Sequence, residues 1–295
     1  MPEPATGELG DDESDFGAAI RAAEAVIAAE TADPAVRPEG RSRLLSHGSR
    51  TERSVLLLHG YTHAPVQFDA LAAAFFDRGY NVWIPRAPGH GTADPDAHHR
   101  VTAAALTRYA DTAMTVAAGL GDEAGVVGIS GGAVLAAWLA QTRGDTVRDL
   151  LLLSPFFAPD AARAPRALIR PMIALYGRGL LPERRTARGY SMRAAAQYLR
   201  VAARLRRPRP TGLRRVAVAI SARDGVVDPV AAIGVPRRLA DAAGIPLGVL
   251  TLPESMGIGH DTLRLGDSAA AVHADYLALY ENSGEPWRAA DVLRA

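Results

Sequence analysis

Apolar and polar positions along this chain follow two patterns, short apolar runs and longer segments with helical spacing. The short runs are almost wholly apolar, which is typical of strands buried on both faces of a parallel sheet. Within 43–60 we expect two neighbouring strands around a Gly-Ser turn. We expect further strands within 80–86, 125–129, 150–153, 216–222 and 247–253, and helices at 66–79, 102–120, 133–144, near 236–243 and at about 267–281. Strands that alternate with helices predict an α/β fold, with a mostly parallel, doubly wound sheet covered by helices on both faces.

Residues 155–212 interrupt this alternation and are rich in proline and arginine. We expect them to form an insertion with helical pieces over the carboxyl edge of the sheet, where ligands bind in open α/β sheets. The core of the fold is then formed by 41–154 and 213–295. Residues 160–215 hold fifteen arginines against two acidic residues. Such a surface indicates either weak contact with anionic surfaces or arginine stems that lie on apolar surface with their charged ends in water.

Residues 1–40 form an acidic N-terminal arm with ten acidic residues and two arginines. Within this arm, 14–30 is expected to form one amphipathic helix, whose apolar stripe contains Phe16, Ile20 and Ile27. The stripe predicts that the helix packs on the body of the protein, on or near the arginine-rich insertion. Exposed ion pairs stabilise by only about 0–1 kcal/mol, so the apolar stripe has to supply most of the docking energy.

The composition of the chain excludes several kinds of protein. Cysteine is absent, which excludes a disulfide framework and a thiolate metal site. No apolar run approaches about 18 residues, so no membrane span is expected. The acidic start lacks the basic and apolar regions of a secretory signal peptide, and we therefore expect a cytoplasmic protein.

The stretch Gly128-Ile129-Ser130-Gly131-Gly132 stands where an apolar strand meets a helix. The pattern G-x-S-x-G forms a sharp strand-to-helix turn that exposes a serine at the top of a sheet, and the glycines avoid collisions in this tight turn. Ser130 also begins the following helix, whose amide dipoles favour a developing negative charge. Ser130 is either a turn residue or a nucleophile, and the strand before it and the helix after it favour a nucleophile.

A serine nucleophile needs a base, and the base needs an orienting acid, in the chain order Ser, acid, His for this kind of turn. Of the two histidines after Ser130, His273 lies inside the last helical pattern and is expected on the surface. His260 lies in a glycine-flanked loop directly after a strand and is therefore the candidate base. Asp224 ends the preceding strand and is the preferred acid. Asp228 is the alternative acid, although it could instead cap a helix.

If Ser130 is a nucleophile that attacks a carbonyl carbon, the carbonyl oxygen becomes negatively charged. N–H groups that face this oxygen are then needed as well. One is expected from Gly131, the residue after the serine, and the other from the loop His59-Gly60-Tyr61-Thr62, with the backbone of Tyr61 as donor. The same loop offers Thr62 as a substrate-binding residue. His59 comes before the serine in the chain, so we interpret it as a brace for this loop rather than as the base.

The motifs LLLHGYTHAP, RGYNVWIPRAPGHGTADP, GISGG, ARDGVVDP and GIGHD stand in the order seen in α/β-hydrolase carboxylesterases and monoacylglycerol lipases. The chain resembles this group over roughly 42–282. The resemblance implies an α/β-hydrolase fold in which 155–212 is a helical cap, and a structural role for His90. Gly131 departs from the pattern, because a larger residue often stands at that position in the family.

The resemblance further implies hydrolysis of carboxylic esters, acyl or monoacylglycerol-like, through an acyl-enzyme on Ser130, with His260 and Asp224. The expected partner is a small-molecule ester, and no metal or organic cofactor is required. Phe156 and Tyr176 are candidate substrate-binding residues of the cap, and packing within the cap is an equal alternative for both.

Two other interpretations keep the same fold. The triad is equally competent to cleave amide, thioester or carbon–carbon bonds, because the pocket decides the bond. A catalytically idle hydrolase fold that binds a ligand is the second alternative. A nucleotide enzyme is disfavoured, because GISGGA lacks the lysine of a phosphate-binding loop and the chain has no lysine at all. We expect no nucleic-acid partner.

Overall fold

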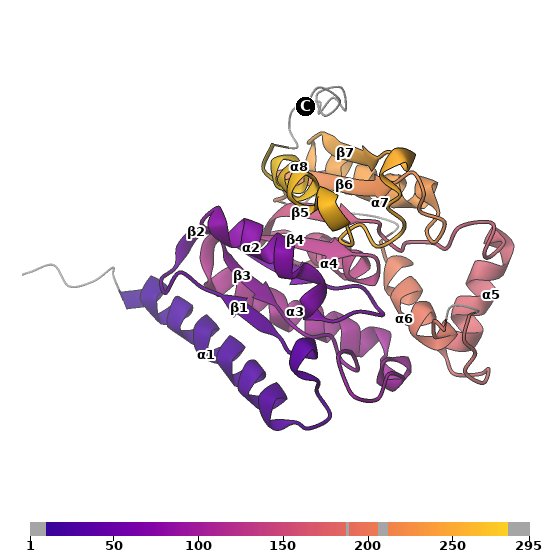
Figure 1. Ribbon diagram of the computed structural model, residues 1–295, viewed down its shortest axis with the longest axis horizontal. Helices are drawn as coiled ribbons and strands as arrows, with labels where there is room; N and C mark the ends of the chain where they lie inside the picture. Colours follow the sequence, from indigo (N-terminus) through magenta and orange to yellow (C-terminus); the bar gives the residue numbers. More distant parts are fainter. Residues whose placement is uncertain (1–9, 187–188, 206–211, 283–295) are drawn as a thin grey trace, which may run out of the picture.

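The computed structural model describes residues 10–186, 189–205 and 212–282. Its centre is a seven-stranded sheet in the order β1-β3-β2-β4-β5-β6-β7 (Figure 1). The strands are β1 (Arg43–Leu45), β2 (Thr51–Leu58), β3 (Asn81–Ile84), β4 (Gly121–Ile129), β5 (Val147–Leu153), β6 (Arg215–Ser221) and β7 (Leu247–Leu252). Only β1 runs antiparallel to its neighbour, and the other pairs of neighbouring strands are parallel. The predicted doubly wound α/β sheet is confirmed.

Helices cover both faces of the sheet. One face carries α2 (Asp69–Asp77) and α8 (Ala269–Asn282), and the other carries α3 (Ala103–Gly119), α4 (Gly131–Thr142) and α7 (Pro229–Ala243). Successive residues of a strand point to opposite faces. Leu56 and Leu58 of β2 therefore join the core under α3 and α4, and Leu57 joins the core under α2 and α8. Burial on both faces is why the strands read as unbroken apolar runs.

Two local expectations differ from the structure. The two strands expected within 43–60 are present, but they are not neighbours, because β3 lies between β1 and β2. The expectation that His273 lies on the surface is wrong. His273 is buried in α8 beside Tyr276, because α8 packs closely against β5 and β6.

The N-terminal helix α1 (Gly10–Ala32) packs on the body, as the apolar stripe predicts, but at a different place. Phe16, Ile20 and Ile27 pack against the core, and α1 lies along α3. Figure 1 shows α1 on the side of the molecule away from the helices of 155–212. The expected position near the arginine-rich insertion is therefore wrong. The C-terminal end of α1 is held by the buried Glu30, which accepts hydrogen bonds from Ser42 and from Arg86 Nε at 3.0 Å.

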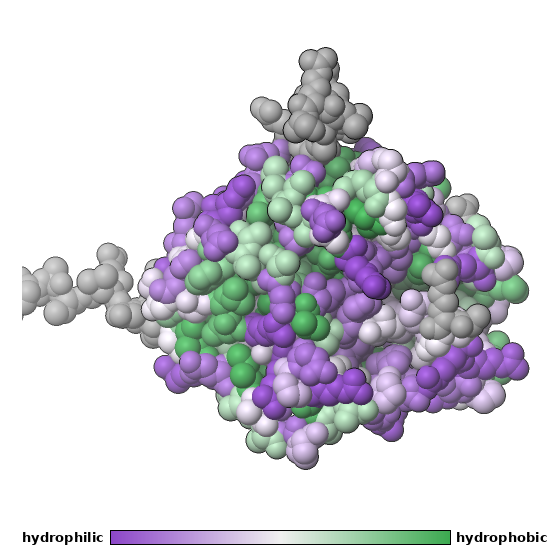
Figure 2. Space-filling view, in the orientation of Figure 1, coloured by the Kyte–Doolittle hydropathy of each residue, from purple (hydrophilic) through white to green (hydrophobic). Residues whose placement is uncertain are grey.

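The segment between β5 and β6 contains two helices, α5 (Arg166–Gly177) and α6 (Met192–Ala202). Helix α6 packs on α3, α4 and α5, and its Tyr198 and Leu199 belong to the main core. Helix α5 lies further out, with Leu168 and Leu175 exposed. Hydrophilic side chains gather over the lower end of α5, at the lower right of Figure 2.

Short 3₁₀ helices complete the connections: η1 (Pro38–Gly40), η2 (Pro65–Phe68), η3 (Ala97–Arg100), η4 (Glu254–Met256) and η5 (Gly266–Ser268). Among the described residues, no helix combines the length and the apolar character that crossing a membrane requires.

Candidate active site

Ser130 lies in a strained turn between β4 and α4. Its backbone has φ 54° and ψ −112°, a region that residues other than glycine rarely adopt. The flanking glycines are required by close approach, because a Cβ on Gly132 would lie 2.0 Å from the carbonyl oxygen of Leu58. A Cβ on Gly128 would lie 2.5 Å from the carbonyl oxygen of Gly132. Strain of this kind persists only where the surrounding structure enforces it, and it is concentrated at functional sites.

The structure brings Ser130, His260 and Asp224 into one hydrogen-bonded string. His260 Nε2 lies 2.8 Å from Ser130 Oγ, and His260 Nδ1 lies 2.8 Å from Asp224 Oδ2. The three residues follow β4, β7 and β6, whose carboxyl ends meet at one edge of the parallel sheet. Asp228 is placed elsewhere, at the N-terminus of α7, where its carboxylate accepts the N–H of Val230 at 2.9 Å.

The environment of Asp224 keeps its carboxyl group ionised. Burial raises the pKa of Asp224, but the hydrogen bond and charge of His260, together with the N–H of Val226, outweigh burial and hold this pKa below its usual range. An ionised carboxylate only accepts hydrogen bonds, so the ring nitrogen that faces it carries the proton. The neutral ring of His260 therefore presents an unprotonated Nε2 to the Ser130 hydroxyl.

Tyr61 lines the same cavity as Ser130 and His260, and Gly131 directly follows Ser130 in the chain. Among the residues that the structure describes, the backbone N–H groups of Tyr61 and Gly131 have no acceptor. The absence of a side chain at Gly131 also has a packing reason, because an added Cβ would lie 2.9 Å from Tyr61 Cβ and 3.0 Å from a ring carbon of Tyr198. The two tyrosines fill the space that a larger residue would need.

Two buried histidines hold the loop that carries Tyr61. His59 Nε2 accepts the N–H of Ala87 at 3.0 Å, and its Nδ1 lies 2.9 Å from the carbonyl of Gly60. His90 Nε2 lies 2.6 Å from the carbonyl oxygen of Tyr61. Burial lowers the pKa of His59 well below its usual value, and burial lowers the pKa of His90 to about 4 although carbonyl contacts oppose this. Burial therefore disfavours the charged form of both rings.

Ser130 and His260 open into an apolar cavity of about 310 Å³. Its apolar walls come mainly from the segment between β5 and β6, with Phe156, Pro159, Ala164, Met172 and Ala195. Thr62 also lines the cavity. Tyr176 is buried within α5 and is not among the lining residues.

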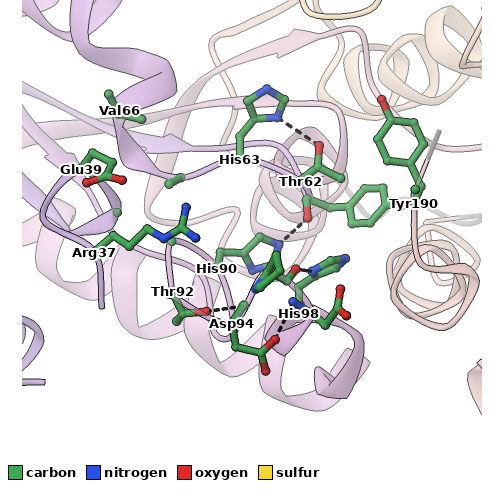
Figure 3. A pocket seen from close by; sticks show the side chains of 18 of the residues that line it. Arg37, Glu39, Thr62, His63, Val66, His90, Thr92, Asp94, His98 and Tyr190 are labelled. Carbon is green, nitrogen blue, oxygen red and sulfur yellow. Dashed lines mark hydrogen bonds between the residues drawn. The ribbon is translucent and has the colours of Figure 1, made fainter. Parts of the chain in front are cut away.

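A second cleft of about 450 Å³ adjoins the apolar cavity (Figure 3), and we call it the polar cleft because its lining is more polar than that of the cavity. It is lined by charged and hydroxyl side chains, including Arg37, Glu39, Thr92, Asp94 and Arg185. The two spaces share Tyr61, Thr62, His63 and Tyr190. A substrate with an apolar and a polar part could therefore contact both.

The sequence did not indicate a further set of contacts between the Tyr61 loop and the His260 loop. Asp261 Oδ1 accepts Gln67 Nε2 at 3.1 Å, and Gln67 Oε1 accepts the N–H of Gly60 at 2.9 Å. His63 Nε2 lies 3.3 Å from Asp261 Oδ2. These partners are about two hundred residues apart, so no local pattern could have revealed them. Within the described residues, no cluster of histidine and carboxylate side chains is arranged to hold a metal ion.

Comparison with known families agrees with this architecture. The model of the family described as serine aminopeptidase, S33, matches residues 49–236. The chain therefore belongs to this family and is a hydrolase with the α/β-hydrolase fold, which confirms the resemblance seen in its motifs.

Individual relatives include lipases. The chain is 34% identical over 97 residues to a thermostable monoacylglycerol lipase from Bacillus sp. (strain H-257), a match that spans 31% of this chain and 36% of that lipase. Its fold is similar to a structure from a study of LipS and LipT, two metagenome-derived lipolytic enzymes, with a TM-score of 0.63, 21% identity and coverage of 83% and 99% of the two chains. A monoacylglycerol lipase from Paleococcus ferrophilus gives a TM-score of 0.63 at 15% identity, over 81% and 98% of the chains.

Proposed function

We propose that this protein hydrolyses carboxylic esters through an acyl-enzyme formed on Ser130. The observation that carries the proposal is the strained Ser130 turn, with Oγ 2.8 Å from His260 Nε2 and His260 in turn 2.8 Å from Asp224. A serine hydroxyl becomes an effective nucleophile when an adjacent base removes its proton and a third group orients that base.

In the first half of the reaction, Ser130 Oγ attacks the ester carbonyl while its proton passes to His260 Nε2. The carbonyl oxygen becomes an oxyanion, which the N–H groups of Tyr61 and Gly131 stabilise. Asp224 stabilises the imidazolium that forms on His260. The tetrahedral intermediate then collapses, the bond to the alkoxy oxygen breaks, and His260 gives its proton to the departing alcohol.

In the second half, a water molecule replaces the alcohol. His260 Nε2 removes a proton from this water as it attacks the acyl carbon, and the same two N–H groups stabilise the second oxyanion. When this intermediate collapses, His260 returns the proton to Ser130 Oγ and the carboxylic acid leaves. Apart from the ester and this water, every group in the two halves belongs to the chain.

The proposed substrates carry an apolar acyl group. The apolar cavity beside Ser130 suits such a group, and the relative from Bacillus is named a monoacylglycerol lipase. Residues 155–212 act in this proposal as a cap, since they supply Phe156, Met172 and Ala195 to the cavity wall. Phe156 contacts the acyl group, and Tyr176 supports the cap from within α5.

A peptide or amide bond is the second candidate, because the family is described as a serine aminopeptidase. The same string of residues cleaves either bond. Two assays separate the candidates: p-nitrophenyl acyl esters of increasing chain length, and aminoacyl p-nitroanilides. Ester hydrolysis with little anilide hydrolysis supports the first candidate, and the reverse overturns it.

Labelling with a fluorophosphonate tests the nucleophile directly. We expect one label per chain, on the peptide that contains Ser130, and no label in Ser130→Ala. A catalytically idle binding protein would not react, and a label on another serine would contradict the assignment.

We also propose that α5 and its C-cap residue Arg178 make weak contact with anionic surfaces. Leu168, Arg170 and Leu175 of α5 are exposed, and so is Arg178. Each basic residue near an anionic lipid surface contributes about 1 kcal/mol, and salt screens this attraction. Binding to phosphatidylglycerol vesicles that weakens with salt supports the contact, and equal binding to neutral vesicles contradicts it.

A further inference from the structure

Thr62 stands where the apolar cavity and the polar cleft meet. It lines both spaces, as do its neighbours Tyr61 and His63. In the proposed reaction an apolar acyl group occupies the cavity beside Ser130. The alcohol part of the ester is then left at the junction and in the polar cleft, so the hydrogen-bonding character of Thr62 bears on which alcohol fits.

The tautomer of the neutral His63 ring follows from its neighbour Asp261. His63 Nε2 lies 3.3 Å from Asp261 Oδ2. Burial raises the pKa of Asp261, but the hydrogen bond and charge of His63 and the N–H of Leu263 outweigh burial and hold this pKa below its usual range. A lone pair on Nε2 would face an ionised carboxylate, which is repulsive. The neutral ring of His63 therefore carries its proton on Nε2 and a lone pair on Nδ1.

The direction of the next hydrogen bond follows from this tautomer. Thr62 Oγ1 lies 3.1 Å from His63 Nδ1, and Figure 3 shows the two side chains turned toward each other. Since Nδ1 can only accept, the Thr62 hydroxyl has to donate its single proton to it. The Thr62 oxygen then has only lone pairs left for other partners. Within the described residues it has no other hydrogen bond.

We propose that Thr62 is a specificity-determining residue that selects esters whose alcohol part carries a hydrogen-bond donor, a hydroxyl or N–H group close to the ester oxygen. The preference deepens the ester hydrolysis proposed above and depends on it. A donor on the alcohol pairs with the Thr62 oxygen. An ether oxygen in its place meets lone pairs and leaves the acceptor unpaired. A neutral hydrogen bond of this kind changes kcat/KM by roughly two- to tenfold.

The test uses two esters with the same butanoyl group and alcohols of nearly equal size, the 2-hydroxyethyl and the 2-methoxyethyl ester, at one alkaline pH. The measured quantity is the ratio of their kcat/KM values. We expect wild type to favour the hydroxyl ester by roughly three- to tenfold. Thr62→Val keeps the shape of the side chain and removes the oxygen. It should bring the ratio close to the ratio of the rates at which the two esters hydrolyse without enzyme. Thr62→Ser should restore it.

Two further variants test how the direction is set. His63→Ala frees the Thr62 hydroxyl to rotate, and Asp261→Asn no longer fixes the tautomer of His63, so both should reduce the ratio. Thr92→Val is the matched control. Thr92 lines the polar cleft but not the cavity of Ser130, and its hydroxyl donates to the carbonyl of Asp94. It should leave the ratio at the wild-type value.

A wild-type ratio no greater than that of the uncatalysed esters, or a ratio that survives Thr62→Val, would overturn the assignment of Thr62 while leaving ester hydrolysis intact. An equal loss of preference in Thr92→Val would show that the preference comes from the polarity of the whole cleft, and this result would also overturn the assignment of Thr62. Failure of wild type to hydrolyse either ester would overturn the proposed function, and with it the role of Thr62.

Discussion

Two histidine sites lie close together at the carboxyl edge of the sheet, and their surroundings differ. His260 is partly exposed, and its ring nitrogens contact a hydroxyl and a carboxylate, those of Ser130 and Asp224. His59 and His90 are only 2% and 4% exposed, and their ring nitrogens contact backbone groups alone. The same side chain is therefore placed in two electrostatic environments a short distance apart.

The difference teaches what makes a histidine suitable for proton transfer. A ring that takes up a proton needs a negative partner to stabilise the imidazolium, and Asp224 is such a partner for His260. Among the described residues no carboxylate contacts His59 or His90, and burial disfavours their charged forms. They can hold the backbone around Tyr61, but they are poorly suited to exchange protons.

The largest expected effects lie at the reacting site. Ser130→Ala and His260→Ala should each reduce kcat for ester hydrolysis by on the order of 10³- to 10⁶-fold, because each removes an essential member of one unit. The double variant should be no worse than either single variant. Circular dichroism and thermal unfolding should show an intact fold. Substantial activity in a clean preparation of Ser130→Ala would remove Ser130 as nucleophile.

The next effect compares two aspartates on one loop. Asp224→Asn should reduce kcat by on the order of 10⁴-fold, because the amide favours the wrong tautomer of His260. Asp228→Asn should keep most of the activity, because Asp228 caps α7 and asparagine is also a good cap. Both variants are assayed with the same ester at saturating concentration. The reverse result would transfer the acid role to Asp228.

A smaller effect is expected at the buried histidines. His90→Leu should reduce kcat by roughly 10- to 100-fold with little change in KM, because leucine has no donor for the Tyr61 carbonyl and the adjacent N–H shifts relative to the oxyanion. His99→Leu, on the neighbouring η3 helix, is the matched control and should behave like wild type. A loss as large as that of His260→Ala would break the distinction between the two sites.

The smallest effect is on stability and depends on pH. The pKa of His90 is lowered by burial to about 4 in the folded chain, against about 6.5 when unfolded. Between these values the unfolded state binds more protons than the folded state. The contribution of His90 to the free energy of unfolding is therefore fully present above about pH 6.5 and is lost as the pH falls toward 4. His59 acts in the same direction.

The measurement is the urea midpoint at intervals from about pH 7.5 to pH 4.5. His90→Gln should be less stable at the upper end but should show a shallower decline, because it removes one of the groups whose titration is linked to unfolding. An equally steep decline in this variant would assign the pH dependence to other groups.

The local sequence was sufficient to predict the parts of the site that depend on short-range geometry. The glycines around Ser130 indicate a turn too tight for side chains, and the close approaches at Gly128 and Gly132 are the reason. The apolar runs predict buried strands, because strands covered on both faces have no polar side. Since parallel strands end at one edge, the chain order also predicts that the loops of Asp224 and His260 lie near Ser130, where the structure has them.

Packing between distant segments decided the rest. Periodicity shows that α1 has an apolar face but not which helix that face meets, and only the tertiary structure placed it on α3 instead of near α5 and α6. Whether an aromatic residue of 155–212 lines the cavity, as Phe156 does, or is buried within its own segment, as Tyr176 is, depends on how α5 docks.

The contacts of Asp261 are the clearest case in which only packing between distant segments decided the structure. The sequence shows only an aspartate next to His260, whereas the fold brings its carboxylate to His63 and Gln67 on a loop about two hundred residues earlier. Sequence by itself determined the strands, the Ser130 turn and the chain order of Ser130, Asp224 and His260, because these depend on neighbours along the chain. The tertiary structure alone decided which polar groups face one another across loops, because hydrogen bonds act over about 3 Å whatever the separation in sequence.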